Sequence, residues 1–167
     1  AFLLIGISDL QNRSQRFADA AKTLEKLQAQ FPDLPAAALA LGEHQVLNDQ
    51  FEAGAATLQA GLREQPTSHG YRILARAEQR QGKLPQALAA INKAIALGSR
   101  ADPNSLRLKA QIHSDMGQHA KAGNSLLRLE RRAGLRPQER LSLALSYYLR
   151  GTPGVGRKFL IRLLEAE

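Results

Sequence analysis

Small and apolar residues recur along the chain at helical spacing, and the arrangement returns about every 34 residues. Four segments, residues 15–33, 49–67, 82–100 and 117–135, each predict a turn followed by an amphipathic helix. A small residue stands at matching positions in them: Ala20, Gly54, Ala87 and Ala122, spaced by 34, 33 and 35 residues. A large aliphatic residue follows four positions later: Leu24, Leu58, Ile91 and Leu126. Residues four apart share one face of a helix, so each helix is expected to pack through this face.

Proline and glycine mark the ends of these predicted helices. Pro32 and Pro66 end two of them, and Gly98 and Gly134 end the other two. A second helical stretch precedes each helix, and a turn glycine separates the two at Gly82, Gly117 and Gly151. The sequence therefore predicts an all-α fold of antiparallel helix pairs that forms one domain over residues 1–167. The pairs are expected at residues 1–34, 35–67, 68–102, 103–136 and 137–167, the last of them incomplete.

This repeat resembles the tetratricopeptide repeat, and the resemblance extends over essentially the whole chain. It rests on the packing positions of the first helices: Leu41 with Gly42, Leu74 with Ala75, and Leu143 with Ala144 and Tyr147. Three positions depart from the family pattern: Ala38 and Arg140 where a bulky residue is usual, and Lys109 where an apolar one is usual. The resemblance implies about five repeats in a right-handed α-solenoid, in which each pair buries its face only against its neighbours. It also implies a concave groove, lined by the first helices, that binds extended peptides.

Three arginines, Arg72, Arg76 and Arg80, follow one another at four-residue intervals on the predicted first helix of the third pair. At 100° per residue they lie away from the packing face, on the flank that the resemblance places in the groove. The candidate partner-binding residues are His69, Arg72, Arg76, Arg80, Asn104, Arg107 and Gln111. Matching positions are mostly apolar in the second pair (Ala36, Leu39, Glu43, Val46, Leu47) and in the fifth (Gln138, Leu141, Leu145, Tyr148, Leu149). A cationic centre between apolar walls suits an acidic peptide, but the same spacing is compatible with a solvated helix face.

Charge is distributed unevenly along the chain, which has a formal net charge of +8. Residues 1–67 contain five Lys and Arg against eight Asp and Glu, a net charge of −3, whereas residues 68–167 contain 18 against seven, a net charge of +11. Such an asymmetry draws acidic partners to one half. Nucleic acid is the less favoured partner, because the chain has no Trp, three Tyr and five Phe, most of them at packing positions, and offers few surfaces for base stacking.

Catalysis and cofactor binding are not expected. The chain has no cysteine, which excludes disulfides and thiolate chemistry, and its four histidines lack metal-binding spacing. The segment GTPGVGRK, residues 151–158, has Arg157 directly after its final glycine and follows a predicted helix, whereas a phosphate-binding loop needs lysine there and a preceding strand. We therefore predict no enzyme activity, no metal and no cofactor.

The last predicted helix contains four large apolar residues, and no further pair follows to cover them: Phe159, Leu160, Leu163 and Leu164. Leu160 and Leu163 are expected to pack inward, whereas Phe159 and Leu164 point elsewhere. End-to-end self-association through this helix is one expectation. Continuation of the native protein is the other, and the absence of an initial Met also suggests a piece of a longer chain. The apolar run Phe2 to Ile7 is too short to span a membrane.

Three classes of function remain. The first is a non-catalytic scaffold that recruits an acidic segment of a partner protein in its groove. The second is the periplasmic tetratricopeptide region of a bacterial exopolysaccharide exporter, which would contact a polymer-modifying enzyme or the polymer itself. Nucleic-acid binding is the third and least favoured class. A periplasmic location follows from the exporter resemblance, with the cytoplasm as the alternative.

Overall fold

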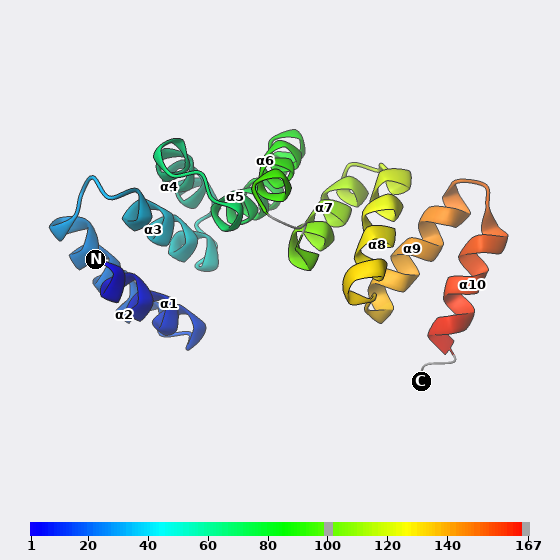
Figure 1. Cartoon of the computed structure of the whole chain (residues 1–167), viewed down its shortest axis with the longest axis horizontal. Helices are drawn as coiled ribbons and strands as arrows, with labels where there is room; N and C mark the ends of the chain where they lie inside the picture. Colours follow the sequence, from blue (N-terminus) through cyan, green and yellow to red (C-terminus); the bar gives the residue numbers. More distant parts are fainter. Residues whose placement is uncertain (99–101, 165–167) are drawn as a thin grey trace. The chain divides into compact units, whose positions relative to one another are not determined.

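The computed structural model describes residues 1–98 and 102–164, with side chains as far as Ile161. Every regular element in this part of the chain is an α-helix (Figure 1). The helices are α1 (Phe2–Arg13), α2 (Phe17–Gln30), α3 (Pro35–Leu47), α4 (Phe51–Glu64), α5 (Ser68–Arg80), α6 (Leu84–Leu97), α7 (Pro103–Asp115), α8 (His119–Ala133), α9 (Pro137–Leu149) and α10 (Pro153–Leu164). They pack in consecutive pairs, and each of the five residue ranges predicted as a repeat contains one pair. The prediction of an all-α fold of helix pairs is confirmed.

Contacts within the chain divide it into two compact units, Ala1–Leu97 with α1 to α6 and Gly98–Glu167 with α7 to α10. Each unit has its own core, and the large residues predicted on the packing face are all buried in these cores: Leu24, Leu58 and Ile91 in the first unit, and Leu126 in the second. The single continuous domain over residues 1–167 stays a prediction.

Local sequence explains where several helices begin. Proline occupies the first turn of α3, α7 and α9, where its missing N–H leaves no hydrogen bond unmade. The hydroxyl of Thr67 accepts a hydrogen bond from the backbone N–H of Gly70 (3.1 Å), and the carboxylate of Asp102 accepts one from Asn104 (2.8 Å). These side chains satisfy backbone donors that the helix itself leaves free.

The turn inside every helix pair uses the same backbone conformation. Gly82, Gly117 and Gly151 have φ of 70–73°, as expected of the predicted turn glycines. In the first two pairs the equivalent residues are Gln15 (φ 58°) and Asp49 (φ 59°), which adopt this left-handed conformation without being glycine.

Replacing Gln15 with glycine is therefore expected to stabilise the first unit. A side chain in the left-handed region costs about 1–2 kcal/mol, which glycine avoids. Glycine also has greater freedom in the unfolded chain, and this offsets about 0.4–1 kcal/mol of the stabilisation. We expect the free energy of unfolding in urea to rise by about 0.5–1 kcal/mol. The control is Ser14→Gly at the neighbouring residue, whose φ is −85°. It should lower stability, and a gain of equal size in both variants would contradict the assignment of strain to Gln15.

Candidate functional site

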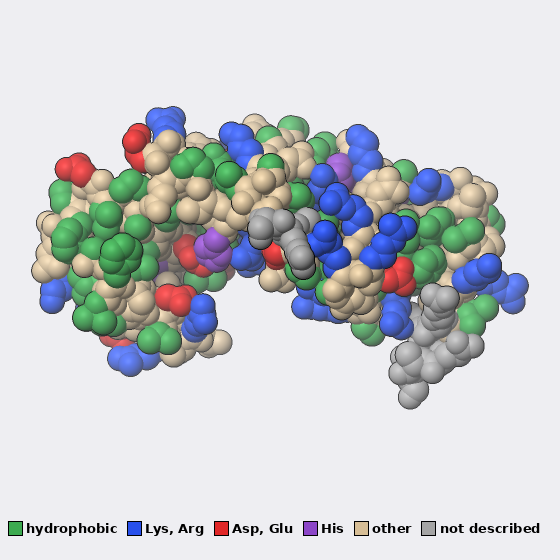
Figure 2. All heavy atoms as spheres, viewed as in Figure 1, with side chains coloured by type: hydrophobic (Ala, Val, Ile, Leu, Met, Phe, Trp, Pro, Cys, Tyr) green, Lys and Arg blue, Asp and Glu red, His purple; other side chains and the backbone are tan. Residues whose placement is uncertain are grey.

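The first helices of the first unit, α1, α3 and α5, surround a surface hollow of about 510 Å³. Ile5, Ala40 and Leu47 supply its apolar lining, and Asp9, Glu43 and His69 are among its polar residues. On the face drawn in Figure 2, a histidine side chain of the first unit lies beside acidic and basic side chains. The hollow combines an apolar surface with fixed hydrogen-bonding groups, as binding sites in proteins usually do.

A hydrogen-bonded chain of three side chains crosses from α3 to α5. His69 Nε2 lies 2.9 Å from each carboxylate oxygen of Glu43, and Arg72 Nη2 lies 2.8 Å from His69 Nδ1. The guanidinium can only donate, so Nδ1 accepts and the ring proton sits on Nε2, from which it donates to Glu43. This arrangement orients Arg72 through His69, whose acceptor Glu43 lies 26 residues away from it in sequence.

The other two arginines of α5 differ in their surroundings. Arg80 lies 3.9 Å from the carboxylate of Asp49, and its guanidinium lies 4.9 Å from the centre of the Phe51 ring. Arg76 is exposed and has no ion-pair or hydrogen-bond partner among the described residues. Of the three arginines on α5, Arg76 is thus the one without a hydrogen-bond, ion-pair or ring contact among the described residues.

Three predicted site residues, Asn104, Arg107 and Gln111, lie on α7 in the second unit. Arg107 and Gln111 line a hollow of about 440 Å³ together with residues of α8 and α9. Arg107 Nε donates to Glu139 Oε1 at 2.7 Å, and these side chains are only 23% and 15% exposed. Asn104 is exposed and accepts a hydrogen bond from Arg107 at 3.4 Å. On the face drawn in Figure 2, Lys and Arg side chains gather over α7 and α8.

An apolar stripe follows the exposed side of α9. Its members are spaced as one helix face requires and are all exposed: Leu141, Leu145, Tyr148 and Leu149. These are the apolar residues predicted for the fifth pair, and the structure leaves them 49–67% exposed. The equivalent stripe of the second pair is less exposed, and only its Leu47 is an exposed large side chain.

The last helix departs from the expected orientation. Phe159 was expected to point away from its own pair, but its ring stacks on Tyr147 of α9, with centroids 5.7 Å apart and planes 10° apart. Leu160, expected to pack inward, is 38% exposed. Phe159 therefore contacts α9 and is half-buried, the reverse of the expected arrangement. The side chains of Leu163 and Leu164 lie outside the described residues.

Sequence reasoning missed Glu43 as a partner of the site. Glu43 was counted in the mostly apolar wall of the second pair, yet it is the group that orients His69. The available signal was its position, because Glu43 and Arg76 stand 33 residues apart at matching places in successive first helices. Opposite charges at equivalent positions of adjacent repeats lie on the same surface of a helix stack.

Burial perturbs two histidines near these surfaces. His44 on α3 and His113 on α7 are buried, and burial lowers the pKa of each imidazole because the charged form loses hydration. A hydrogen bond with Gln118 opposes this shift for His113. His44 Nδ1 lies 2.8 Å from Asn12 Oδ1, and Asn48 Nδ2 lies 3.1 Å from His44 Nε2, so both ring nitrogens are occupied.

The lowered pKa of His44 predicts a pH dependence of stability. Below about pH 6.5, the ordinary pKa of histidine, the unfolded chain binds protons that buried His44 resists, so the free energy of unfolding falls as pH decreases. Urea unfolding at pH 7.5 and 5.5 should show this loss of stability. His44→Gln should be less stable at pH 7.5 but lose less on acidification. His119→Gln should keep the dependence of the parent, and an unchanged slope in His44→Gln would show that His44 is not the group responsible.

Two further observations concern the described residues. No helix among them has the length and apolar character needed to cross a membrane. Their His, Asp and Glu side chains nowhere gather in a group of three that could hold a metal ion.

Comparisons with known proteins agree with this architecture. A family model described as tetratricopeptide repeat matches residues 12–77. No curated protein sequence matches the chain. A crystal structure of MamA aligns with a TM-score of 0.84 and 20% identity over 95% of this chain and 93% of that one. A second crystal structure of MamA protein aligns with a TM-score of 0.83 and 19% identity over 98% of this chain and 90% of that one. The structure of MamA 41-end from Desulfovibrio magneticus RS-1 aligns with a TM-score of 0.83 and 12% identity over 98% of this chain and 92% of that one. At these identities the likeness to MamA is one of fold, and the chain has the helix-pair solenoid fold of tetratricopeptide repeats. The match to the repeat family itself covers residues 12–77.

Proposed function

We propose that the protein is a non-catalytic scaffold that binds an acidic segment of a partner protein along the first helices of its pairs. The observation that carries the proposal is Arg76, an exposed cation with no partner among the described residues, in the middle of the arginine row on α5. His69, at the start of this helix, lines the hollow between α1, α3 and α5. A partner could therefore place a carboxylate on the row and an apolar side chain in the hollow.

The surroundings of the row favour binding over mere solvation. Arg72 is oriented by His69, and Arg80 by Asp49 and the Phe51 ring, so both guanidinium groups lose less freedom when a ligand binds. Guanidinium groups present planar, charge-assisted donors that match carboxylates. An acidic segment would find Arg76 free and its neighbours already positioned.

Both acidic residues named in the hollow have a partner within the chain. Asp9 forms an ion pair with Arg13 at 3.0 Å, and Glu43 accepts from His69. Arg13 offsets the charge of Asp9, whereas Glu43 keeps its negative charge. The partner's carboxylate is therefore expected on Arg76 and not in the hollow. Ile5, Ala40 and Leu47 are the part of the hollow that would receive an apolar side chain.

The test is binding of a fluorescent eight-residue peptide of alternating Glu and Leu, measured by anisotropy at physiological salt. The double variant Arg72→Glu, Arg76→Glu replaces two donors with repelling carboxylates. We expect the Kd to rise roughly 30-fold, about 2 kcal/mol, while the circular dichroism spectrum stays helical.

The matched control is Lys22→Glu, Lys26→Glu. These exposed lysines lie on α2 of the same unit with the same four-residue spacing, so the change in net charge is identical. Their reversal should raise the Kd less than about threefold, because distant surface charges are screened. Equal losses in both variants would mean that the peptide reads only net charge, and unchanged binding in both would place the site elsewhere. Either result contradicts the proposal.

Asn104, Arg107 and Gln111 extend the proposal to a separate surface in the second unit. There the exposed α9 stripe would supply apolar contacts beside the hollow of α7 to α9. Self-association through α10, the periplasmic location and the link to polysaccharide export remain predictions.

A further inference from the structure

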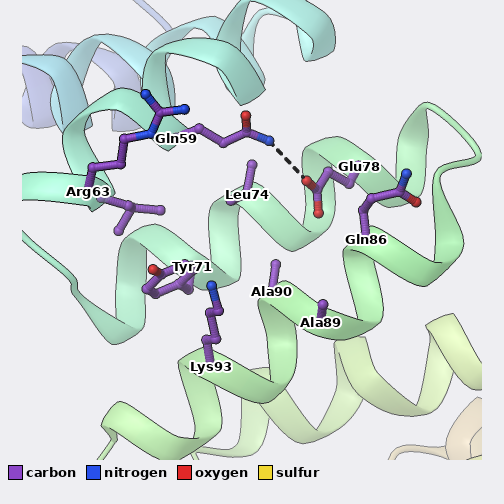
Figure 3. Close-up of a pocket in the computed structure, with 10 residues that line it drawn as sticks. Gln59, Arg63, Tyr71, Leu74, Glu78, Gln86, Ala89, Ala90 and Lys93 are labelled. Carbon is purple, nitrogen blue, oxygen red and sulfur yellow. Dashed lines mark hydrogen bonds between the residues drawn. The ribbon is translucent and has the colours of Figure 1, made fainter.

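A second hollow of the first unit, of about 350 Å³, lies between α4, α5 and α6 (Figure 3). It is formed by other faces of these helices than the row of Arg72, Arg76 and Arg80, none of which lines it. Leu62, Leu74 and Ala90 give it an apolar lining. Gln59, Glu78 and Gln86 bring polar groups to one end.

Glu78 is the unusual residue of this pocket. It is 5% exposed, and its Oε1 accepts a hydrogen bond from Gln59 Nε2 at 3.3 Å. Its Oε2 is buried and has no hydrogen-bond partner among the described residues. Buried polar atoms in proteins are nearly always paired, because an unpaired acceptor loses its hydrogen bonds to water on folding and gains none in return. Figure 3 shows this carboxylate between the side chains of Gln59 and Gln86, directed into the pocket.

Electrostatics around Glu78 are consistent with an unmet need for a donor. Burial raises the pKa of the Glu78 carboxyl, because the ionised form loses hydration. The hydrogen bond from Gln59 and the positive charges of Lys83 and Lys93 oppose this effect without cancelling it. Lys93 itself is directed elsewhere, since its Nζ lies over the Tyr71 ring, 5.3 Å from the centroid.

We propose that this pocket receives an arginine side chain of a partner protein, whose guanidinium donates to the carboxylate of Glu78. A planar guanidinium has several donors, so further N–H groups remain for other polar side chains of the pocket, among them Gln86. The aliphatic stem would lie against Leu62, Leu74 and Ala90. Arg63 and Lys93 also line the pocket, so the guanidinium has to lie at the Glu78 end, where an anionic ligand would meet the negative charge of Glu78.

The experiment titrates the folded protein with N-acetyl-arginine amide and follows backbone amide shifts by NMR. We expect saturable shifts centred on Tyr71, Ala89 and Ala90, with millimolar affinity because a single side chain is the probe. N-acetyl-citrulline amide, which has the same shape without the positive charge, should bind about tenfold more weakly, since loss of a charge-assisted hydrogen bond costs about one factor of ten.

Glu78→Gln is the decisive variant, because it preserves shape and removes the carboxylate charge. It should fold at neutral pH, since a group with a raised pKa destabilises the native state as pH rises through that value and the amide has no such cost. Its affinity for the arginine probe should fall about tenfold. Glu52→Gln, an exposed change on α4, should bind like the parent.

Undiminished binding by Glu78→Gln, equal affinity for citrulline, or no saturable shift at the pocket would each overturn the proposal. The pocket and the arginine row are tested with probes of opposite charge. Failure of the acidic peptide to bind would therefore contradict the proposed function and not the arginine pocket. Failure of the arginine probe would contradict the pocket and not the proposed function.

Discussion

Replacing Gly54 with leucine is expected to lower the free energy of unfolding of the first unit by about 3 kcal/mol, at the upper end of the usual cost of overpacking a core. Helices α3 and α4 meet at this residue. A Cβ atom at Gly54 would lie 2.6 Å from Val46 Cγ2 and 3.0 Å from the carbonyl oxygen of Gly42. The carbonyl belongs to the backbone, so the clash is relieved only if the two helices separate. Urea unfolding followed by circular dichroism measures the loss.

Gly6→Leu is the matched control for this variant. Gly6 also lies within a helix, but nothing surrounds the place where its Cβ would be within 4 Å. Leucine favours helix over glycine by up to about 1 kcal/mol, so this variant should be as stable as the parent or more so. Comparable destabilisation by both changes would show that the close approach of α3 and α4 is not the cause.

Leu129→Ala is expected to destabilise the second unit by about 3 kcal/mol, within the range for truncating a buried leucine. Leu129 on α8 is 0% exposed. Its removal forfeits apolar burial and leaves a cavity that the surrounding helices fill only in part. The same measurement of unfolding in urea applies, with hydrogen exchange of the α8 amides as an independent reading of local opening.

The companion change, Leu141→Ala, tests whether the α9 stripe is exposed in solution. Leu141 belongs to the α9 stripe and is 55% exposed, so its truncation should alter stability by less than about 0.5 kcal/mol. A large leucine that contributes little to folding is available for contact with a partner. If Leu141→Ala were as destabilising as Leu129→Ala, the stripe would have to be covered in solution, and the exposed surface described above would be wrong.

The helix pairs could be predicted from sequence because their information is local and repeated. Ala20, Gly54, Ala87 and Ala122 mark one helix face four times over, so an ambiguous signal in one repeat is corrected by the others. The arrangement in α10 could not be foreseen in this way. The helical wheel places Leu160 inward and Phe159 elsewhere, whereas in the structure Phe159 stacks on Tyr147, a contact that the wheel does not contain.

The candidate site was predictable in its positions but not in its pairings. Spacing along α5 places Arg72 and Arg76 on one flank, but Arg72 also bonds His69, which in turn bonds Glu43 of α3. Arg107 was expected to be a groove donor, and its ion pair with Glu139 spans 32 residues. Side-chain partners at such separations depend on how neighbouring pairs stack. A single sequence gives the length of the repeat but does not show which side chains of neighbouring pairs meet.

The shared backbone of the five inter-helix turns has a practical consequence. The chain contains no cysteine and no tryptophan, so any one introduced is unique in it. Gln15 and Asp49 already place a side chain in the left-handed turn conformation, and both are exposed. A cysteine at either position would add little new strain and would attach a fluorophore or spin label outside the helix contacts. Because Asp49 also pairs with Arg80, Gln15 is the better point, at which ligand-induced motion can be followed while the proposed binding surfaces keep their native residues.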